Sequence, residues 1–201
     1  MDQRSSHVVV HPSVNVKFWA ERTPDVQTCR PARCPKCGAA GCPVGERLGL
    51  VGHGLRSRQL RGRPTPDASP IVQMLQVRRY RCVGCGAIAT VLPRGAVRAR
   101  HFAATAVALA CVMYGLSGAS LRDTRAQVSP WRSAEPGWPA MRRWLGAIAC
   151  GAIFTSVRPW PDRWPGRRQA ERVAQAVLAA VPAEGALGVR VFAGAELLAC
   201  A

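Results

Sequence analysis

Two stretches of the 201-residue sequence share one form, Cys34-Pro-Lys-Cys37-Gly38 and Cys82-Val-Gly-Cys85-Gly86. The spacing of two residues lets both thiolates of a stretch reach the same ion, and the glycine permits the tight turn that follows. Two such pairs supply four soft ligands, which is the closed tetrahedral set of structural Zn²⁺. We predict that these four cysteines hold a structural zinc ion: Cys34, Cys37, Cys82 and Cys85.

Other interpretations of the cysteines stay open at this point. A shifted ligand set would use Cys42, which follows Cys37 by five residues, and both Cys29 and His53 lie near the first pair. The four paired cysteines are alternatively ordinary buried residues. A redox dithiol would need one pair in a βαβ setting, which the sequence lacks. The shared form of the two pairs favours the zinc site.

The chain has nine cysteines and no apolar run of a secretory signal near its N-terminus. Disulfides are rare in proteins that are not secreted, so metal ligation is the default interpretation of paired cysteines. We therefore expect a cytoplasmic protein. The uncharged stretch 102–121 is long enough to cross a membrane, but it consists largely of small residues that contribute little to insertion. It predicts a buried helix, and we expect no membrane partner.

Composition changes along the chain and predicts an α+β fold with a β-rich part before a helical part. Residues 1–28 form an N-terminal lead-in with a short β-like stretch, and residues 29–96 form a small zinc ribbon. The 44 residues between the cysteine pairs exceed the usual spacing of about 15–20, and an inserted hairpin over 48–77 explains the excess. Residues 97–157 form a helix-turn-helix-like domain. Residues 158–201 hold a linker, an amphipathic helix and a weakly structured tail.

The recurrence of apolar residues every three or four positions predicts helices after residue 98. The first helix has its apolar face at five residues: Phe102, Ala106, Leu109, Met113 and Leu116. A short second helix over 121–128 begins at Ser120, a good N-cap. The third helix, over 139–152, has its apolar face at four residues: Met141, Trp144, Leu145 and Ile148. The amphipathic fourth helix covers 167–181.

The net charge of +17 comes from 28 Lys and Arg residues against 11 Asp and Glu residues. A surplus of this size favours a polyanionic partner, above all nucleic acid, because phosphate neutralisation releases counterions. Between Arg47 and Arg100 the only acidic residue is Asp67. We predict six nucleic-acid contacts in the hairpin and the strand before the second cysteine pair: Arg56, Arg58, Arg61, Arg63, Arg78 and Arg79. The alternative is a solvated surface in a chain rich in arginine throughout.

The helical part offers a second basis for DNA binding. A helix-turn-helix buries the apolar faces of its helices together and places the last helix in the major groove. On the third predicted helix, Arg142 and Arg143 fall away from the apolar face, so we predict that they contact DNA. The alternative is a plain three-helix bundle whose arginines serve solubility.

The motifs together resemble a known family. They are Cys-Pro-x-Cys-Gly at 34–38, Gly-His-Gly-x-Arg-x-Arg at 52–58, Arg-Tyr-Arg-Cys-x-x-Cys-Gly at 79–86, then Gly-Leu-Ser at 115–117 and Arg-Arg-Trp at 142–144. This series resembles the N-terminal part of bacterial insertion-sequence transposases, and small bacterial proteins that consist of that part alone. The resemblance covers about residues 34–152. It implies a zinc ribbon and a helix-turn-helix that precede a catalytic core.

The chain departs from that family after the third helix. A transposase core of the ribonuclease-H type needs three carboxylates that hold two metal ions. Residues 153–201 contain only four acidic residues: Asp162, Glu171, Glu184 and Glu196. We therefore expect a protein that is not an enzyme but binds nucleic acid, most simply double-stranded DNA. The alternatives are a zinc-stapled protein–protein adaptor and a remnant or accessory of a transposase. Self-association stays open.

Overall fold

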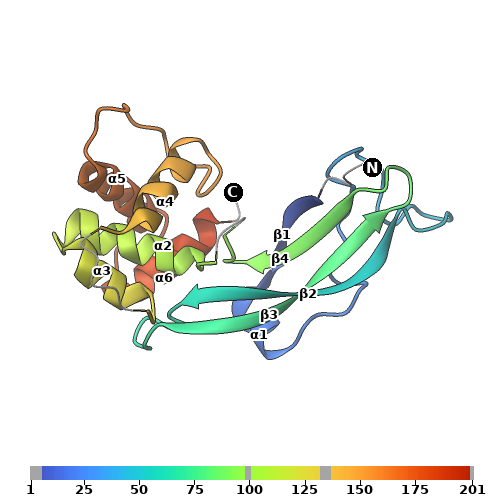
Figure 1. The fold of residues 1–201 in the computed structure, drawn as a ribbon, viewed down its shortest axis with the longest axis horizontal. Coiled ribbons are helices and arrows are strands. Elements are labelled where there is room, and N and C mark those ends of the chain that lie inside the picture. Colours follow the sequence, from blue (N-terminus) through green and yellow to red (C-terminus); the bar gives the residue numbers. More distant parts are fainter. Residues whose placement is uncertain (1–5, 98–100, 132–136, 200–201) are drawn as a thin grey trace. The chain divides into compact units, whose positions relative to one another are not determined.

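The computed structural model describes residues 6–97, 101–131 and 137–199, and its fold is α+β, as predicted (Figure 1). The chain divides into two compact units: Met1–Gln59 with Met74–Arg94, and Leu60–Gln73 with Gly95–Ala201. The first unit contains the two cysteine pairs, and the second contains all helices after residue 100.

A four-stranded sheet has the strand order β1-β4-β3-β2. Its strands are β1 (Ser6–Asn15), β2 (Leu50–Gly62), β3 (Ile71–Cys82) and β4 (Ile88–Arg94). β4 is parallel to β1 and antiparallel to β3. β2 and β3 are the hairpin that the wide spacing of the cysteine pairs predicts, although β3 continues to Cys82 (Figure 1). The tip of this hairpin, residues 60–73, belongs to the second unit.

Residues 1–28, expected to be a lead-in, instead contribute a strand and a helix to the first unit. β1 pairs with β4 from Ser6↔Ile88 onward, and α1 (Val16–Glu21) follows it directly. Trp19 on α1 is buried, and its Nε1 donates a hydrogen bond to the carbonyl oxygen of Gln76 at 2.9 Å. The β-forming valines of β1 are visible in the sequence, but the strand that pairs with them begins only at residue 88.

The core of the first unit surrounds the cysteine pairs. Trp19, Leu50, Tyr80 and Val91 pack in one cluster with three cysteines: Cys29, Cys34 and Cys82. The Tyr80 hydroxyl donates a hydrogen bond to the carbonyl oxygen of Val26 at 2.8 Å, so the buried phenol is satisfied. The first cysteine of each pair is therefore part of this apolar core.

The second unit contains six helices in its described residues. They are α2 (Ala104–Cys111), the π-helix η1 (Val112–Leu116), α3 (Leu121–Val128), α4 (Pro139–Ala149), α5 (Gly166–Ala179) and α6 (Leu187–Leu198). Ser120 caps α3 as predicted, since its Oγ accepts a hydrogen bond from the Asp123 N–H at 3.1 Å. The four helices expected from the apolar spacing are all present, with ends that differ by a few residues.

The first helix differs from its predicted form. The sequence predicts a single apolar face that ends at Leu116, but seven of the eight residues of α2 are buried and Leu116 is 42% exposed. α2 packs against α3, α4, α5 and α6, which its small side chains permit on every side. In η1, a Cβ atom on Gly115 would lie 2.3 Å from the backbone nitrogen of Glu171, so only glycine allows this contact with α5.

α4 buries the face that its sequence predicts: Met141, Trp144, Leu145 and Ile148. Trp144 packs edge-to-face against Phe102 and Trp138, with ring centroids 4.9 and 4.8 Å away. Such aromatic pairs add about 1 kcal/mol beyond the area that they bury. They fix α4 to the start of α2, while Arg142 and Arg143 remain exposed.

The predicted weakly structured tail is instead helix α6, which buries Val191, Phe192 and Ala195. Gly194 lets α6 approach α5 closely, because a Cβ at that position would lie 2.1 Å from the carbonyl oxygen of Val177. This helix could not be predicted from the sequence, because small residues make much of its contact with the neighbouring helices and no periodic set of large apolar residues marks it.

No helix in the described part of the chain is long and apolar enough to cross a membrane.

Candidate metal centre and arginine surface

The four predicted cysteines meet in the first unit. The sulfur atoms of Cys34, Cys37, Cys82 and Cys85 all lie within 4.8 Å of one another. The Sγ atoms of Cys34 and Cys85 are 3.7 Å apart, and those of Cys37 and Cys82 are also 3.7 Å apart. In residues 6–97, 101–131 and 137–199, this is the only cluster of three or more histidine, cysteine or acidic side chains with metal-binding geometry.

The two pairs sit in turns of identical backbone form, which we call the first knuckle (Cys34–Gly38) and the second knuckle (Cys82–Gly86). In each, the N–H of the first cysteine donates to the carbonyl five residues later, at 2.8 and 2.9 Å. The glycine N–H donates back to the carbonyl of that cysteine, at 2.9 and 3.0 Å. Gly38 and Gly86 have φ values of +73° and +69°, the left-handed region that favours glycine. The two knuckles therefore hold their pairs of sulfur atoms with the same turn geometry.

The hairpin closes at this cluster, which explains how 44 intervening residues fit between the pairs. β2 begins at Leu50 and β3 ends at Cys82. The Val83 N–H of the second knuckle donates to the Gly49 carbonyl at 2.9 Å, just before β2. A Cβ on Gly49 would lie 2.1 Å from the carbonyl oxygen of Ala40, so the chain after the first knuckle lies against the base of the hairpin.

The sulfur positions fit a tetrahedral metal ion. Metal–sulfur bonds of about 2.3 Å place the sulfur atoms of a regular tetrahedron about 3.8 Å apart. This is close to the 3.7 Å between the sulfur atoms of Cys34 and Cys85 and between those of Cys37 and Cys82. Burial raises the pKa of the Cys34 thiol, but hydrogen bonds from the backbone N–H groups of Cys37 and Lys36 and from the neighbouring thiols outweigh it and bring this pKa to about 7. The backbone N–H of Ala39 lowers the pKa of Cys37, but the neighbouring sulfur atoms outweigh it and raise this pKa to about 11, so one thiol of the cluster ionises more readily than the other. Thiolate is the form that binds metals. The four cysteines can therefore hold a metal ion.

Neither Cys42 nor His53 belongs to the cluster, and both are exposed. The shifted ligand set that uses Cys42 is therefore not the one that the fold assembles. Cys29 lies in the core of the first unit, where burial raises the pKa of its thiol to about 11. Cys111 is likewise buried in α2, and burial raises its pKa to about 12. These two thiols pack as small apolar side chains.

The glycines of the knuckles give a direct test of the turn geometry. Gly86→Ala places a Cβ on a residue with φ of +69° and is expected to destabilise the first unit by about 1 kcal/mol. Gly84→Ala in the same knuckle is the control, because neither a positive φ nor a close atom opposes its Cβ. Chemical denaturation of the metal-loaded protein measures both. Equal stability of the two variants would contradict the turn described above.

The eight arginines predicted to contact nucleic acid differ in their exposure to solvent. Arg56, Arg142 and Arg143 are exposed, and the other five are half-buried: Arg58, Arg61, Arg63, Arg78 and Arg79. Arg142 and Arg143 lie opposite the buried face of α4, as their spacing predicts.

Three of the half-buried arginines are held by contacts within the protein. Arg63 donates hydrogen bonds to the Gln127 carbonyl at 2.8 Å, to the Pro66 carbonyl at 2.9 Å and to the Gln127 side-chain oxygen. Arg61 stacks on Trp131, with its guanidinium carbon 3.7 Å from the ring centroid. Arg78 donates to the Pro24 carbonyl. The sequence could not reveal these contacts, because each partner except Pro66 lies more than fifty residues away.

The chain was compared with protein-family models, with curated proteins and with solved structures, and nothing matches it in any of the three. The resemblance to insertion-sequence transposases therefore stays a prediction based on the motifs.

Proposed function

We propose that this protein is a zinc-stabilised, double-stranded DNA-binding protein of transposase-related type without a catalytic core of its own. One observation carries the proposal. Residues 29–96, whose two ends the cysteine cluster joins, contain twelve lysines and arginines against two acidic residues, Glu46 and Asp67. An imbalance of this size favours contact with the phosphate groups of nucleic acid.

Zinc is the ion that suits the site best. Four thiolates form a soft, closed set that leaves no position for water, so the ion would serve structure rather than catalysis. Once bound, it would link the first knuckle to the second knuckle across 44 residues of sequence. The chain's own residues contribute the turns that aim the sulfur atoms and the core that supports them.

Arg58 also interacts within the protein, as Arg61, Arg63 and Arg78 do, so four of the eight predicted arginines remain for phosphate contacts. Arg56 is exposed on β2, and Arg79 is half-buried on β3. Arg142 and Arg143 are exposed on α4, which has the dimensions of a helix that enters a major groove. Within the described part of the chain, the contact found for Arg143 is a long hydrogen bond, 3.4 Å, to Pro139 of its own helix.

Salt dependence tests this proposal. Four phosphate contacts predict a slope of about −3.6 for log affinity against log salt, which is about a 150-fold loss between 50 and 200 mM. The measurement uses the zinc-loaded full chain and a blunt fluorescent duplex, with and without chelator. We expect binding that weakens steeply with salt and is lost on chelation. A slope near zero, or no binding at 50 mM salt, would contradict DNA binding.

Removal of the two α4 arginines gives the matching mutational test. The double variant Arg142→Ala/Arg143→Ala is expected to flatten the salt slope by about 1.8, since two phosphate contacts are lost. Arg158→Ala/Arg163→Ala is the control, because it removes the same charge from two exposed residues between α4 and α5. If both pairs change the slope equally, α4 has no special role and only net charge matters.

A protein–protein adaptor is the second candidate, and exposed apolar residues near the knuckles favour it. Val44 is fully exposed, Val83 in the second knuckle is 62% exposed and Leu48 is 36% exposed. Exposed apolar groups of this kind often mark protein contacts. An adaptor binds duplex DNA weakly and without the steep salt slope, so the same titration separates the two candidates.

A further inference from the structure

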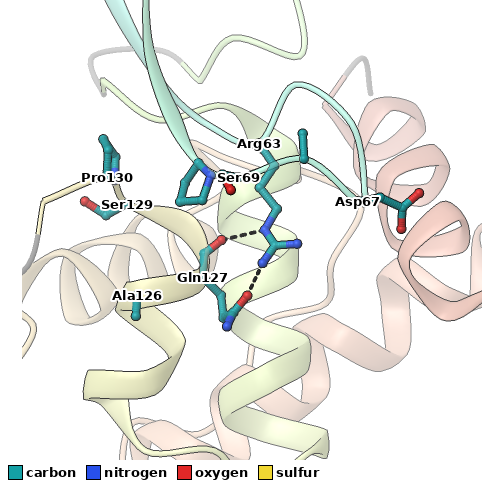
Figure 2. A pocket seen from close by; sticks show the side chains of 9 residues that line it. Arg63, Asp67, Ser69, Ala126, Gln127, Ser129 and Pro130 are labelled. Carbon is teal, nitrogen blue, oxygen red and sulfur yellow. Dashed lines mark hydrogen bonds between the residues drawn. The ribbon is translucent and has the colours of Figure 1, made fainter.

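A polar pocket of about 390 Å³ lies within the second unit, between the hairpin tip and the end of α3. Figure 2 shows six of the residues that matter for its chemistry: Arg63, Asp67, Ser69, Gln127, Ser129 and Pro130. Its size falls in the range of pockets that hold small molecules, about 300–1,000 Å³. Every residue that lines it belongs to the second unit.

The pocket contains hydrogen-bond donors without acceptors. Arg63 uses three of its five N–H groups on Gln127 and Pro66, so two are left. Among the described residues, the side-chain nitrogen of Gln127 and the hydroxyl hydrogen of Ser129 have no acceptor, and Ser129 is only 5% exposed. Arg63 and Gln127 are half-buried and line the pocket, so a ligand there can accept hydrogen bonds from the donors that the protein leaves unused. The pocket therefore suits a ligand that is rich in acceptor oxygens.

The arrangement of charge in the pocket favours an anion. The Arg63 guanidinium is fixed by its three hydrogen bonds, so it is oriented before any ligand arrives. One of these bonds also covers the Gln127 carbonyl, the negative end of α3. The Asp67 carboxylate points away from Arg63 and Gln127 (Figure 2). A phosphate group would thus meet donors rather than the carboxylate.

An aromatic surface lies next to this pocket. Trp131 follows two residues of the pocket, Ser129 and Pro130, and is 46% exposed. Arg61, two residues before Arg63, stacks on one face of its ring, with the guanidinium carbon 3.7 Å from the ring centroid. A phosphate site beside an exposed tryptophan suits one nucleotide, whose base stacks on an aromatic ring while its phosphate is held by donors.

We propose that this pocket binds one unpaired nucleotide of a DNA strand, with its phosphate on Arg63, Gln127 and Ser129 and its base on Trp131. The inference rests on the proposed DNA binding and extends it. A base inside a duplex is stacked on its neighbours and has no face left for Trp131. The site therefore selects a single-stranded segment or an extruded base.

The test compares a short single-stranded oligonucleotide with a blunt duplex of the same sequence, bound to the zinc-loaded full chain. In the first variant, Gln127→Glu, the new carboxylate still accepts from Arg63, so the hairpin tip stays attached, but it repels phosphate. The control is Gln175→Glu, which adds the same charge at an exposed position on α5. We expect Gln127→Glu to weaken single-strand binding about tenfold and the control to change it little.

The second variant pair addresses the base. Trp131→Ala is expected to weaken single-strand binding about tenfold, whereas Trp131→Phe retains a ring and most of the affinity. Neither variant should change binding of the blunt duplex by more than about twofold. Circular dichroism of each variant verifies that the helical unit is folded.

Each outcome decides between the two proposals. If duplex binding follows the salt slope given above but neither variant affects the single strand, DNA binding stands and the pocket proposal is overturned. If the variants weaken duplex and single strand equally, the pocket is a general phosphate contact and selects no unpaired nucleotide. If the unmodified protein binds neither DNA, both proposals fail.

Discussion

Replacement of Cys37 by serine is expected to release the metal ion and unfold the first unit. Cys37 is exposed, so the substitution leaves the core intact and removes only a thiolate from the cluster. Structural zinc contributes about 10–16 kcal/mol in small zinc domains at neutral pH, which exceeds the total stability of many domains, about 5–15 kcal/mol. A site of three thiolates and a serine hydroxyl retains only part of that free energy.

The measurement is metal content by mass spectrometry under native conditions, together with thermal denaturation. Cys42→Ser is the matched control, because Cys42 is also exposed, lies five residues away and is outside the cluster. We expect one ion per chain and an unchanged melting temperature for the control. Stoichiometric metal and a normal melting temperature in Cys37→Ser would remove the basis for the site.

Acid should have the same effect as loss of a ligand. Thiolates bind the ion and thiols do not, so protons compete with the metal and the affinity falls as the pH falls. Metal retention across a pH titration of the unmodified protein should therefore parallel its melting temperature. The Cys37→Ser variant should show little pH dependence of this kind, since it starts without the ion.

The sequence revealed the parts of the site that are local. Each knuckle is complete within five residues, so its cysteine spacing and its glycine were readable without knowledge of the fold. The wide gap between the knuckles also indicated the hairpin correctly, because closing the site requires the chain to return to its starting point. The apolar face of α4 followed from helical spacing in the same local way.

Contacts between residues that lie far apart in the sequence could not be predicted from it. The sequence predicts only a lead-in where β1 lies, because its partner β4 is about eighty residues away in the sequence and parallel pairing has no turn motif that would indicate it. Arg61 and Arg63, two of the predicted DNA contacts, also make contacts within the protein, with Trp131 and Gln127, which follow more than sixty residues later. The number of positive charges does not show which arginines make contacts within the protein and which are available to a ligand.

Replacement of Gly194 by alanine is the second large effect that we expect, and it tests the helix that the sequence did not indicate. The added methyl group would lie 2.1 Å from the Val177 carbonyl oxygen and 3.0 Å from its carbonyl carbon. Both are backbone atoms inside α5, so α6 must move away from α5 as a whole. Overpacking of this kind costs about 1–3 kcal/mol, and we expect the upper part of that range.

Gly146→Ala is the control in the same unit. Gly146 is exposed in the interior of α4 with no atom near its Cβ position, so alanine there should stabilise the helix by about 0.5–1 kcal/mol. The two variants make the same chemical change with opposite expected signs. Urea denaturation followed by circular dichroism at 222 nm measures both free energies of unfolding.

The result also bears on DNA binding. α6 packs on α2, and α2 packs on α4, which carries Arg142 and Arg143. If Gly194→Ala loosens the unit, duplex affinity should fall although none of the proposed DNA contacts has changed, and Gly146→Ala should leave it intact. If Gly194→Ala is instead as stable as the unmodified protein, α6 does not pack on α5. The end of the chain would then be as weakly structured as its sequence alone indicates.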